Sequence, residues 1–235
     1  MAKSAEKDRK VRVEEMRRAQ QAAERRRTML VVGAAVAVVV LLAGIVTKVV
    51  LDSQADRDMT RIGATAAAAS CDAVTTDKTV GSGVHIGPGT DQPNKLTVKY
   101  ATVPPTSGEH YVTPEYPARA FYTAEDRPAL ETLVHNLEHG YTVVWYTAST
   151  PQAQVDQLKR IADLARKDKA TGGGKFIVSA WDDSRGAFPA GKTIGMSHWG
   201  AQDGHRQMCG AVSGAAIKDF ITKFPSTDSP EPNGA

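Results

Sequence analysis

The sequence contains three short segments, each punctuated by glycine, whose side chains could bind a metal ion. The densest is HNLEHG at residues 135–140. On a helix, His135 and His139 share a face because they lie four residues apart, so both imidazoles can reach one ion. We therefore predict that both histidines are metal ligands. Glu138, between them, is predicted to support the site by orienting an imidazole.

The second segment, MSHWG at residues 196–200, combines a thioether with an imidazole. Side chains alternate along a strand, so Met196 and His198 would project from the same face. Soft sulfur beside imidazole nitrogen suits copper, above all Cu(I), better than zinc. The segment therefore favours copper over zinc, although a methionine is more often a core residue than a ligand.

The third segment, PPTSGEH at residues 104–110, is expected to be a loop that its prolines and glycine hold in shape. It presents Glu109 and His110 next to each other. If the three segments meet in the fold, one site results. Its predicted ligands are His110, His135, His139, Met196 and His198, supported by Glu138 and Glu109.

The string H-x-x-E-H at residues 135–139 is also a metallopeptidase pattern, in which Glu138 would be the general base beside zinc. In such enzymes the helix continues past the motif. Here Gly140 is expected to end the helix, and residues 141–147 read as a strand. The sequence therefore favours a protein without catalytic activity.

The PPTSGEH and HNLEHG segments also resemble the signature of a bacterial family of unknown function, common in actinobacteria, with PPTSGxH and HxLEHG blocks. The resemblance extends from about Gly83 through MSHWG to the last predicted helix. Members of that family are often anchored at the N-terminus and carry an exported domain, so the resemblance implies the same topology here. It places His110, His135, Glu138 and His139 in the signature blocks and implies no activity.

A membrane anchor is predicted from the uncharged run of residues 29–47, which three further apolar residues extend to position 51. This run is long enough to span a bilayer, is apolar on all sides and lacks a nearby signal-peptide cleavage site. Residues 1–27 carry ten of the 29 Lys and Arg but only five of the 26 Asp and Glu. By the positive-inside rule, the N-terminus is expected to be cytoplasmic and residues 52–235 to be exported.

The chain is thus expected to be a single-pass protein of the cell membrane with an extracytoplasmic C-terminal domain. Its predicted parts are a basic cytoplasmic head (1–28), a transmembrane helix (29–51), a tether (52–70), an exported globular domain (71–225) and a disordered tail (226–235). The formal net charge of +3 is too small for a strongly basic nucleic-acid binder, so no nucleic-acid partner is expected.

The two cysteines, Cys71 and Cys209, both lie in the part predicted to be exported. In an oxidising compartment such a pair most often forms a disulfide. It would join the start of the folded domain to the region before its last helix. Two thiolate ligands or a redox pair are the alternatives.

Hydrophobic periodicity predicts an α/β domain, with a mixed α+β arrangement as the alternative. The predicted strands cover residues 95–102, 141–147, 175–181 and 192–199; the predicted helices cover residues 127–139, 151–170 and 211–224. Thr150 is expected to cap the second helix. A mixed sheet flanked by helices in this order also occurs in thioredoxin-like folds, although the sequence has no Cys-x-x-Cys motif.

Two functions fit these features. The favoured one is an extracytoplasmic protein that binds copper, or less favourably zinc, through the His/Met side chains. The other is a non-catalytic accessory or structural subunit whose single helix packs into a membrane protein complex. Both functions require the membrane as a partner.

Overall fold

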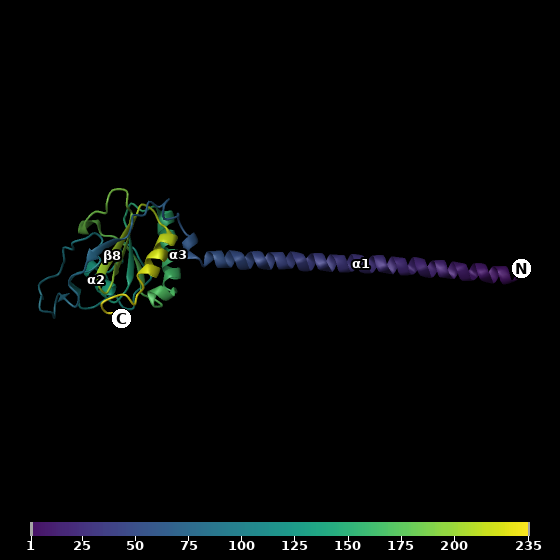
Figure 1. The fold of residues 1–235 in the computed structure, drawn as a ribbon, viewed down its shortest axis with the longest axis horizontal. Coiled ribbons are helices and arrows are strands. Elements are labelled where there is room, and N and C mark those ends of the chain that lie inside the picture. The colour runs from purple at the N-terminus through teal and green to yellow at the C-terminus, as the bar shows by residue number, and fades with distance from the viewer. Residues whose placement is uncertain (1, 235) are drawn as a thin grey trace. The chain divides into compact units, whose positions relative to one another are not determined.

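The computed structural model describes residues 2–234, apart from the side chains of residues 2–6, 8–9 and 52–56 (Figure 1). Met1 and Ala235 lie outside the described residues. The chain forms two compact units, Met1–Ala55 and Asp56–Ala235.

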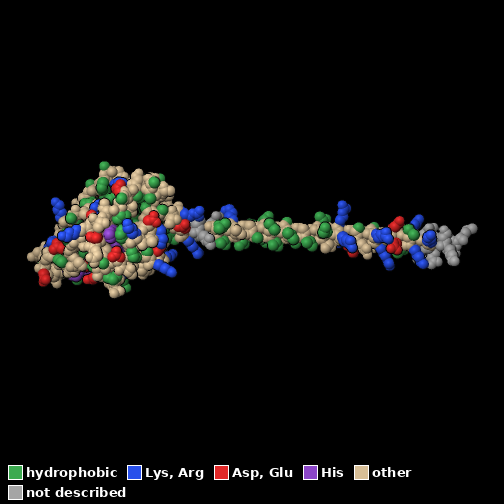
Figure 2. All heavy atoms as spheres, in the orientation of Figure 1, with side chains coloured by type: hydrophobic (Ala, Val, Ile, Leu, Met, Phe, Trp, Pro, Cys, Tyr) green, Lys and Arg blue, Asp and Glu red, His purple; other side chains and the backbone are tan. Residues whose placement is uncertain are grey.

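The first unit is a single helix, α1 (Ala2–Asp56). Lys and Arg side chains gather along its N-terminal half, and the following stretch is apolar (Figure 2). As a helix, residues 29–51 are about 34 Å long, whereas the hydrocarbon core of a bilayer is about 30 Å thick. By length and composition, α1 could therefore span a membrane.

The second unit is built on a six-stranded mixed sheet with the order β1-β8-β7-β5-β6-β4. The strands are β1 (Thr75–Lys78), β4 (Phe121–Tyr122), β5 (Thr142–Tyr146), β6 (Phe176–Ala180), β7 (Ile194–Trp199) and β8 (Asp203–Cys209). Strands β4, β5 and β6 are parallel, and each of the other neighbouring pairs is antiparallel. Three helices accompany the sheet: α2 (Leu130–Glu138), α3 (Gln152–Ala165) and α4 (Gly214–Lys223).

A separate pair of short parallel strands, β2 (His85–Ile86) and β3 (His110–Tyr111), completes the unit. The predicted α/β class, with a mixed sheet flanked by helices, is confirmed. The thioredoxin-like arrangement stays a prediction.

Two hydrophobic clusters lie on the two faces of the sheet, because side chains alternate along each strand. Helices α3 and α4 pack on the face that carries Val144 and Met196 (Figure 1). Helix α2 packs on the opposite face, with Val143 and Trp199. Neighbouring positions of β7 therefore belong to different layers of the molecule.

The predicted strands at 141–147, 175–181 and 192–199 correspond to β5, β6 and β7, and the three predicted helices correspond to α2, α3 and α4. Thr150 does not cap α3. Its Oγ1 instead donates a hydrogen bond to O of Thr193 at 3.4 Å, so the helix begins after Pro151 without a side-chain cap.

The strand predicted over residues 95–102 is absent, and this segment is irregular. Its backbone groups bond to side chains instead of to a neighbouring strand. The N–H of Val98 donates to Oε1 of Glu131 at 2.9 Å, and O of Val98 accepts from Arg185 at 3.0 Å. Because no partner strand among the described residues lies beside this segment, its backbone cannot form the hydrogen bonds of a sheet. The bonds to Glu131 and Arg185 therefore determine the conformation of the segment.

The predicted tether and tail both differ from expectation where the structure describes them. Met59 and Ile62 pack in the hydrophobic cluster under α4. At the other end, the C-terminal segment (residues 225–234) is held by Lys175, whose Nζ donates to O of Pro232 at 2.7 Å and to O of Gly234 at 3.0 Å. The tail composition suggested disorder, but its carbonyl groups satisfy a partly buried ammonium group.

The predicted disulfide between Cys71 and Cys209 is present. It joins the segment before β1 to the end of β8 across 138 positions of sequence. Both cysteines pack with the cluster under α3 and α4.

Candidate metal centre

Four side chains with metal-ligand chemistry meet beside α2: His85, His110, His135 and Glu138, here called the His/Glu cluster. One ligand atom from each lies within 4.8 Å of the ligand atoms of the other three. His85 and His110 are register partners in the β2–β3 pair. His135 and Glu138 are three residues apart on α2 and so share its face.

The histidine rings of the cluster contact one another directly. The ring centroids of His110 and His135 are 4.6 Å apart, and those of His85 and His110 are 4.9 Å apart. His110 and Glu138 are fully buried, and His135 is 5 % exposed. Trp199 closes one side, with its ring 6.0 Å from that of His110.

Backbone carbonyl groups fix the tautomers of two rings. Nδ1 of His110 lies 2.8 Å from O of Gly108, and Nδ1 of His135 lies 2.6 Å from O of Tyr111. Because a carbonyl oxygen only accepts, both Nδ1 atoms carry the proton. Nε2 is therefore the ring nitrogen of each that is left to bind a ligand, and a bond from Nδ1–H to a carbonyl oxygen is the arrangement found in metal-binding histidines.

Glu138 is oriented in the same way. Its Oε1 accepts from the N–H of Gly83 at 2.7 Å and from Oγ of Ser82 at 2.8 Å, and its Oε2 faces the cluster. Burial by itself would raise the pKa of Glu138, but the adjacent His110 imidazole and the hydrogen bonds from Ser82 and Gly83 outweigh it and lower the pKa to about 2. Glu138 is therefore a carboxylate at neutral pH.

Three buried ligand atoms of the cluster have no hydrogen-bond partner among the described residues: Nε2 of His85, Nε2 of His110 and Oε2 of Glu138. Nε2 of His110 is 2.9 Å from Oε2 of Glu138, close enough for an ion pair but without hydrogen-bond alignment. Two acceptors this close require a proton or a metal ion between them. Burial lowers the pKa of His135 to about 4, only partly offset by the bond to Tyr111, so its ring stays neutral and able to bind a metal.

The donor set fits a transition metal of borderline softness. Three imidazole nitrogens and one carboxylate oxygen are typical ligands of Zn²⁺ and Cu²⁺. In a tetrahedral complex with bonds of about 2.0–2.1 Å, the ligand atoms lie about 3.4 Å apart. The ligand atoms of the cluster lie within 4.8 Å of one another, so some pairs would have to approach by up to about 1.4 Å to complete this coordination.

Two predicted ligands lie elsewhere. Met196 and His198 project from the face of β7 that packs under α3 and α4, whereas the cluster lies on the face covered by α2. Met196 is fully buried in the hydrophobic cluster. Both ring nitrogens of His198 contact oxygen atoms, Oγ1 of Thr142 and O of Asp228. The two residues do share one face of β7, as the alternation of side chains predicts. That face is opposite to the one beside the His/Glu cluster, so neither residue can be a ligand of the same ion as His110 and His135.

His139 and Glu109 lie at the border of the cluster. Nε2 of His139 is 3.1 Å from Nε2 of His135, but His139 is not among the four converging residues. Glu109 turns away to form an ion pair with Lys95 and to accept from Nε2 of Gln92 at 3.0 Å. Glu138, predicted to support the site from behind, instead directs an oxygen atom into it.

The predicted set lacked His85, which precedes the three segments. The available signal was its glycine-rich surroundings, GSGVHIGPG at residues 81–89, which resemble the loops that carry the other candidate residues. Strands β2 and β3 have only two residues each, which is too short for the sequence pattern to predict that they pair.

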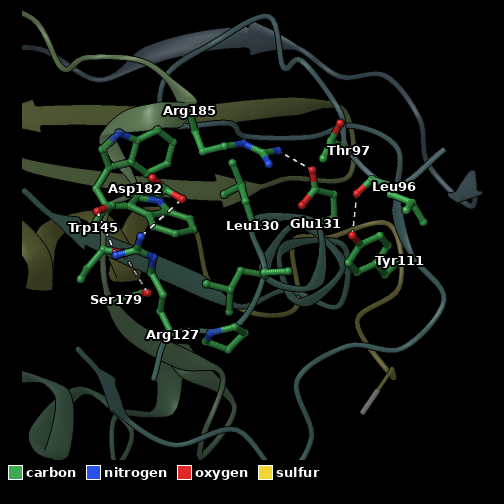
Figure 3. Close-up of a pocket in the computed structure, with 15 residues that line it drawn as sticks. Leu96, Thr97, Tyr111, Arg127, Leu130, Glu131, Trp145, Ser179, Asp182 and Arg185 are labelled. Atoms are coloured by element: carbon green, nitrogen blue, oxygen red, sulfur yellow. Dashed lines mark hydrogen bonds and ion pairs between the residues drawn. The ribbon is translucent and has the colours of Figure 1, made fainter. Parts of the chain in front are cut away.

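A second concave feature is a cavity of about 320 Å³ beside the N-terminal end of α2 (Figure 3). The four cluster residues do not line it. Its charged side chains pair with one another: Arg127 lies 3.3 Å from Asp182, and Arg185 contacts Glu131. These pairs hold the loop after β6 against α2, which gives the charges a structural role.

Comparison with known proteins places the chain in a protein family. A family model described as "Protein of unknown function (DUF3105)" matches residues 92–235, more than half of the chain. This range contains His110, His135 and Glu138, whereas His85 precedes it. No curated protein and no solved structure matches the chain. The signature blocks and the actinobacterial range stay predictions, but the chain belongs to the DUF3105 family of proteins of unknown function.

Proposed function

We propose that this protein binds one divalent transition-metal ion through His85, His110, His135 and Glu138. The observation that carries the proposal is the convergence of three buried ligand atoms without hydrogen-bond partners among the described residues. A buried polar group without a hydrogen bond costs about 1–3 kcal/mol. A bound cation would remove that cost at Nε2 of His85 and would replace the unaligned contact between His110 and Glu138.

The ligand set restricts which metal ions fit the site. With Met196 on the opposite face of the sheet, soft sulfur no longer supports Cu(I). Imidazole suits both Cu²⁺ and Zn²⁺, and for the same ligands Cu²⁺ binds more tightly. Copper thus remains favoured over zinc, now as Cu²⁺ and on grounds of affinity.

We further propose that α1 is an uncleaved membrane anchor and that the metal-binding unit is extracytoplasmic. The excess of Lys and Arg before residue 28 supports a cytoplasmic N-terminus. The Cys71–Cys209 disulfide fits an oxidising compartment outside the cytoplasm. The protein would then handle a metal ion at the outer surface of the cell membrane.

Metal analysis of the full chain in mild detergent tests the proposal. After incubation with Cu²⁺ or Zn²⁺ and removal of free ions, the unaltered chain should retain one equivalent, with a Kd in the micromolar range or below. His110→Ala and His135→Ala should lose most of it. His205→Ala is the matched control, because it removes a histidine from β8 outside the cluster. Absence of bound metal from a folded, unaltered chain would refute the proposal.

A further inference from the structure

A line of donor atoms leads from the surface to the His/Glu cluster. Oε2 of Glu231 lies 3.3 Å from Nε2 of His139, which in turn lies 3.1 Å from Nε2 of His135. The Glu231 side chain is 51 % exposed, whereas that of His139 is 8 % exposed. The three donors therefore connect solvent with the buried side chain of a proposed ligand.

The spacing of these donors suits transfer of an ion. Two ligand atoms on one tetrahedral ion with bonds of about 2.0–2.1 Å lie about 3.3–3.4 Å apart. The Glu231–His139 pair and the His139–His135 pair both approach this separation. An ion could therefore be shared by the outer pair and then by the inner pair without large movement of either side chain.

The chain fixes both outer residues in place. The N–H of Glu231 donates to O of Glu138 at 3.0 Å, which ties the C-terminal segment to the end of α2. Nζ of Lys175 donates to O of His139 at 2.7 Å and also bonds carbonyl groups of that segment. Gly234 packs directly against the ring of His139. These contacts place Glu231 and His139 beside the cluster as a defined pair.

We infer that Glu231 and His139 form a transfer site through which a divalent metal ion reaches and leaves the His/Glu cluster. This inference rests on the proposed metal binding and assigns residues that the four-ligand site does not use. The ion first bonds to Oε2 of Glu231 and Nε2 of His139. The bond to His135 then forms as the bond to Glu231 breaks. Finally the bond to His139 breaks as the other cluster ligands bind; no electron is transferred.

Stopped-flow mixing of Cu²⁺ with the metal-free full chain in detergent tests the transfer site. Cu²⁺ at the cluster should quench the fluorescence of Trp199, whose ring lies 6.0 Å from that of His110. In His139→Asn and Glu231→Gln, loading and extraction by EDTA should both slow by about tenfold, while Kd changes by less than about threefold. Asp163→Asn removes an exposed carboxylate on α3 and should leave both rates unchanged.

The outcomes separate the two proposals. If the unaltered chain binds Cu²⁺ but the two variants load and release it at unaltered rates, the transfer site is refuted and the metal centre stands. A loss of affinity in His139→Asn of more than about tenfold at an unchanged loading rate would make His139 a permanent ligand and also refute the transfer site. If the folded, unaltered chain takes up neither Cu²⁺ nor Zn²⁺, the metal centre itself fails.

Discussion

Individual histidines of this domain have opposite roles that their hydrogen bonds define. In His110 and His135 one ring nitrogen donates to a backbone carbonyl and the other faces the cluster. In His198, Nε2 donates to O of Asp228 at 2.6 Å, and Nδ1 contacts Oγ1 of Thr142 at 3.3 Å. Both nitrogens of His198 contact oxygen atoms of the fold, whereas Nε2 of His110 and Nε2 of His135 face other side chains with metal-ligand atoms, Glu138 and His139.

His198 should make the metal-free protein less stable in acid. Burial lowers its pKa to about 4, and the hydrogen bond to Asp228 offsets this only in part. Between pH 6.5 and 4 the unfolded chain therefore binds a proton that the folded chain excludes, so the free energy of unfolding decreases as pH falls. From pH 7 to 4.5 the decrease from this residue should be about 2–3 kcal/mol.

Urea unfolding followed by tryptophan fluorescence, on EDTA-treated chain in detergent, measures this effect. His198→Gln does not titrate and should show a smaller loss of stability between pH 7 and 4.5. Part of the loss should remain, because burial also lowers the pKa of His135 and of His205. Asp228, whose charge raises the pKa of His198, stays present in both proteins. An identical pH dependence in the two proteins would contradict the assignment.

At the scale of elements, the end of α2 is the junction between the cluster and the C-terminal segment. The helix stops at Glu138, and Gly140 follows with φ +86°, a conformation that residues with a Cβ rarely adopt. A Cβ at this position would lie 2.1 Å from O of Ser226. The glycine therefore permits both the turn into β5 and the close approach of the C-terminal segment.

Gly140→Ala should accordingly destabilise the domain by roughly 3 kcal/mol or more, combining backbone strain with the clash against Ser226. Gly191→Ala is a matched control, since Gly191 has φ +76° and open space around the position of a Cβ. Gly191→Ala should lower the free energy of unfolding only by the backbone strain, about 1–2 kcal/mol. Chemical unfolding of both variants measures the difference, and equal losses would show that the C-terminal segment does not constrain this turn.

Elements with strong local patterns were predictable, and those defined by distant partners were not. Helix α3 and the buried strands β5 and β6 carry patterns that their own residues define. The segment 95–102 has a strand pattern as well, but Glu131 and Arg185 take its backbone bonds. Strand β8 (Asp203–Cys209) combines polar and apolar residues without clear alternation, so only its pairing with β7 reveals it.

The candidate site follows the same rule. His135 and Glu138 were recognisable because a helix places residues three or four positions apart on one face. His110 was predicted as a ligand because it follows a loop shaped by prolines and glycine. His85 could be identified only from the pairing of β2 with β3, which places it beside His110. Met196 was misplaced because alternation tells which residues share a face but not which layer that face meets.

For the whole molecule, the disulfide and the proposed metal centre stabilise different layers. Cys209 packs in the cluster under α3 and α4, whereas His110 and Glu138 lie on the side of the sheet covered by α2. A closed loop of this length can contribute up to about 5 kcal/mol by restricting the unfolded chain. The bond from the N–H of Asp72 to O of Met208 holds the same segment independently. Loss of the disulfide should therefore weaken the fold without dismantling the site.

Replacing both cysteines, C71S together with C209S, should lower the free energy of unfolding by about 2–5 kcal/mol and leave the metal stoichiometry at its unaltered value. Thermal unfolding of the full chain in detergent, with and without a reducing agent, measures the first effect, and metal analysis measures the second. Reductant should bring the unaltered chain to the Tm of the double variant and leave the double variant unchanged. A loss of metal in the double variant, measured without reductant, would instead mean that the two faces of the sheet are coupled, since the disulfide contacts only one of them. Equal Tm values for the oxidised and fully reduced chains would show that the edge formed by β1 and β8 holds without the covalent link.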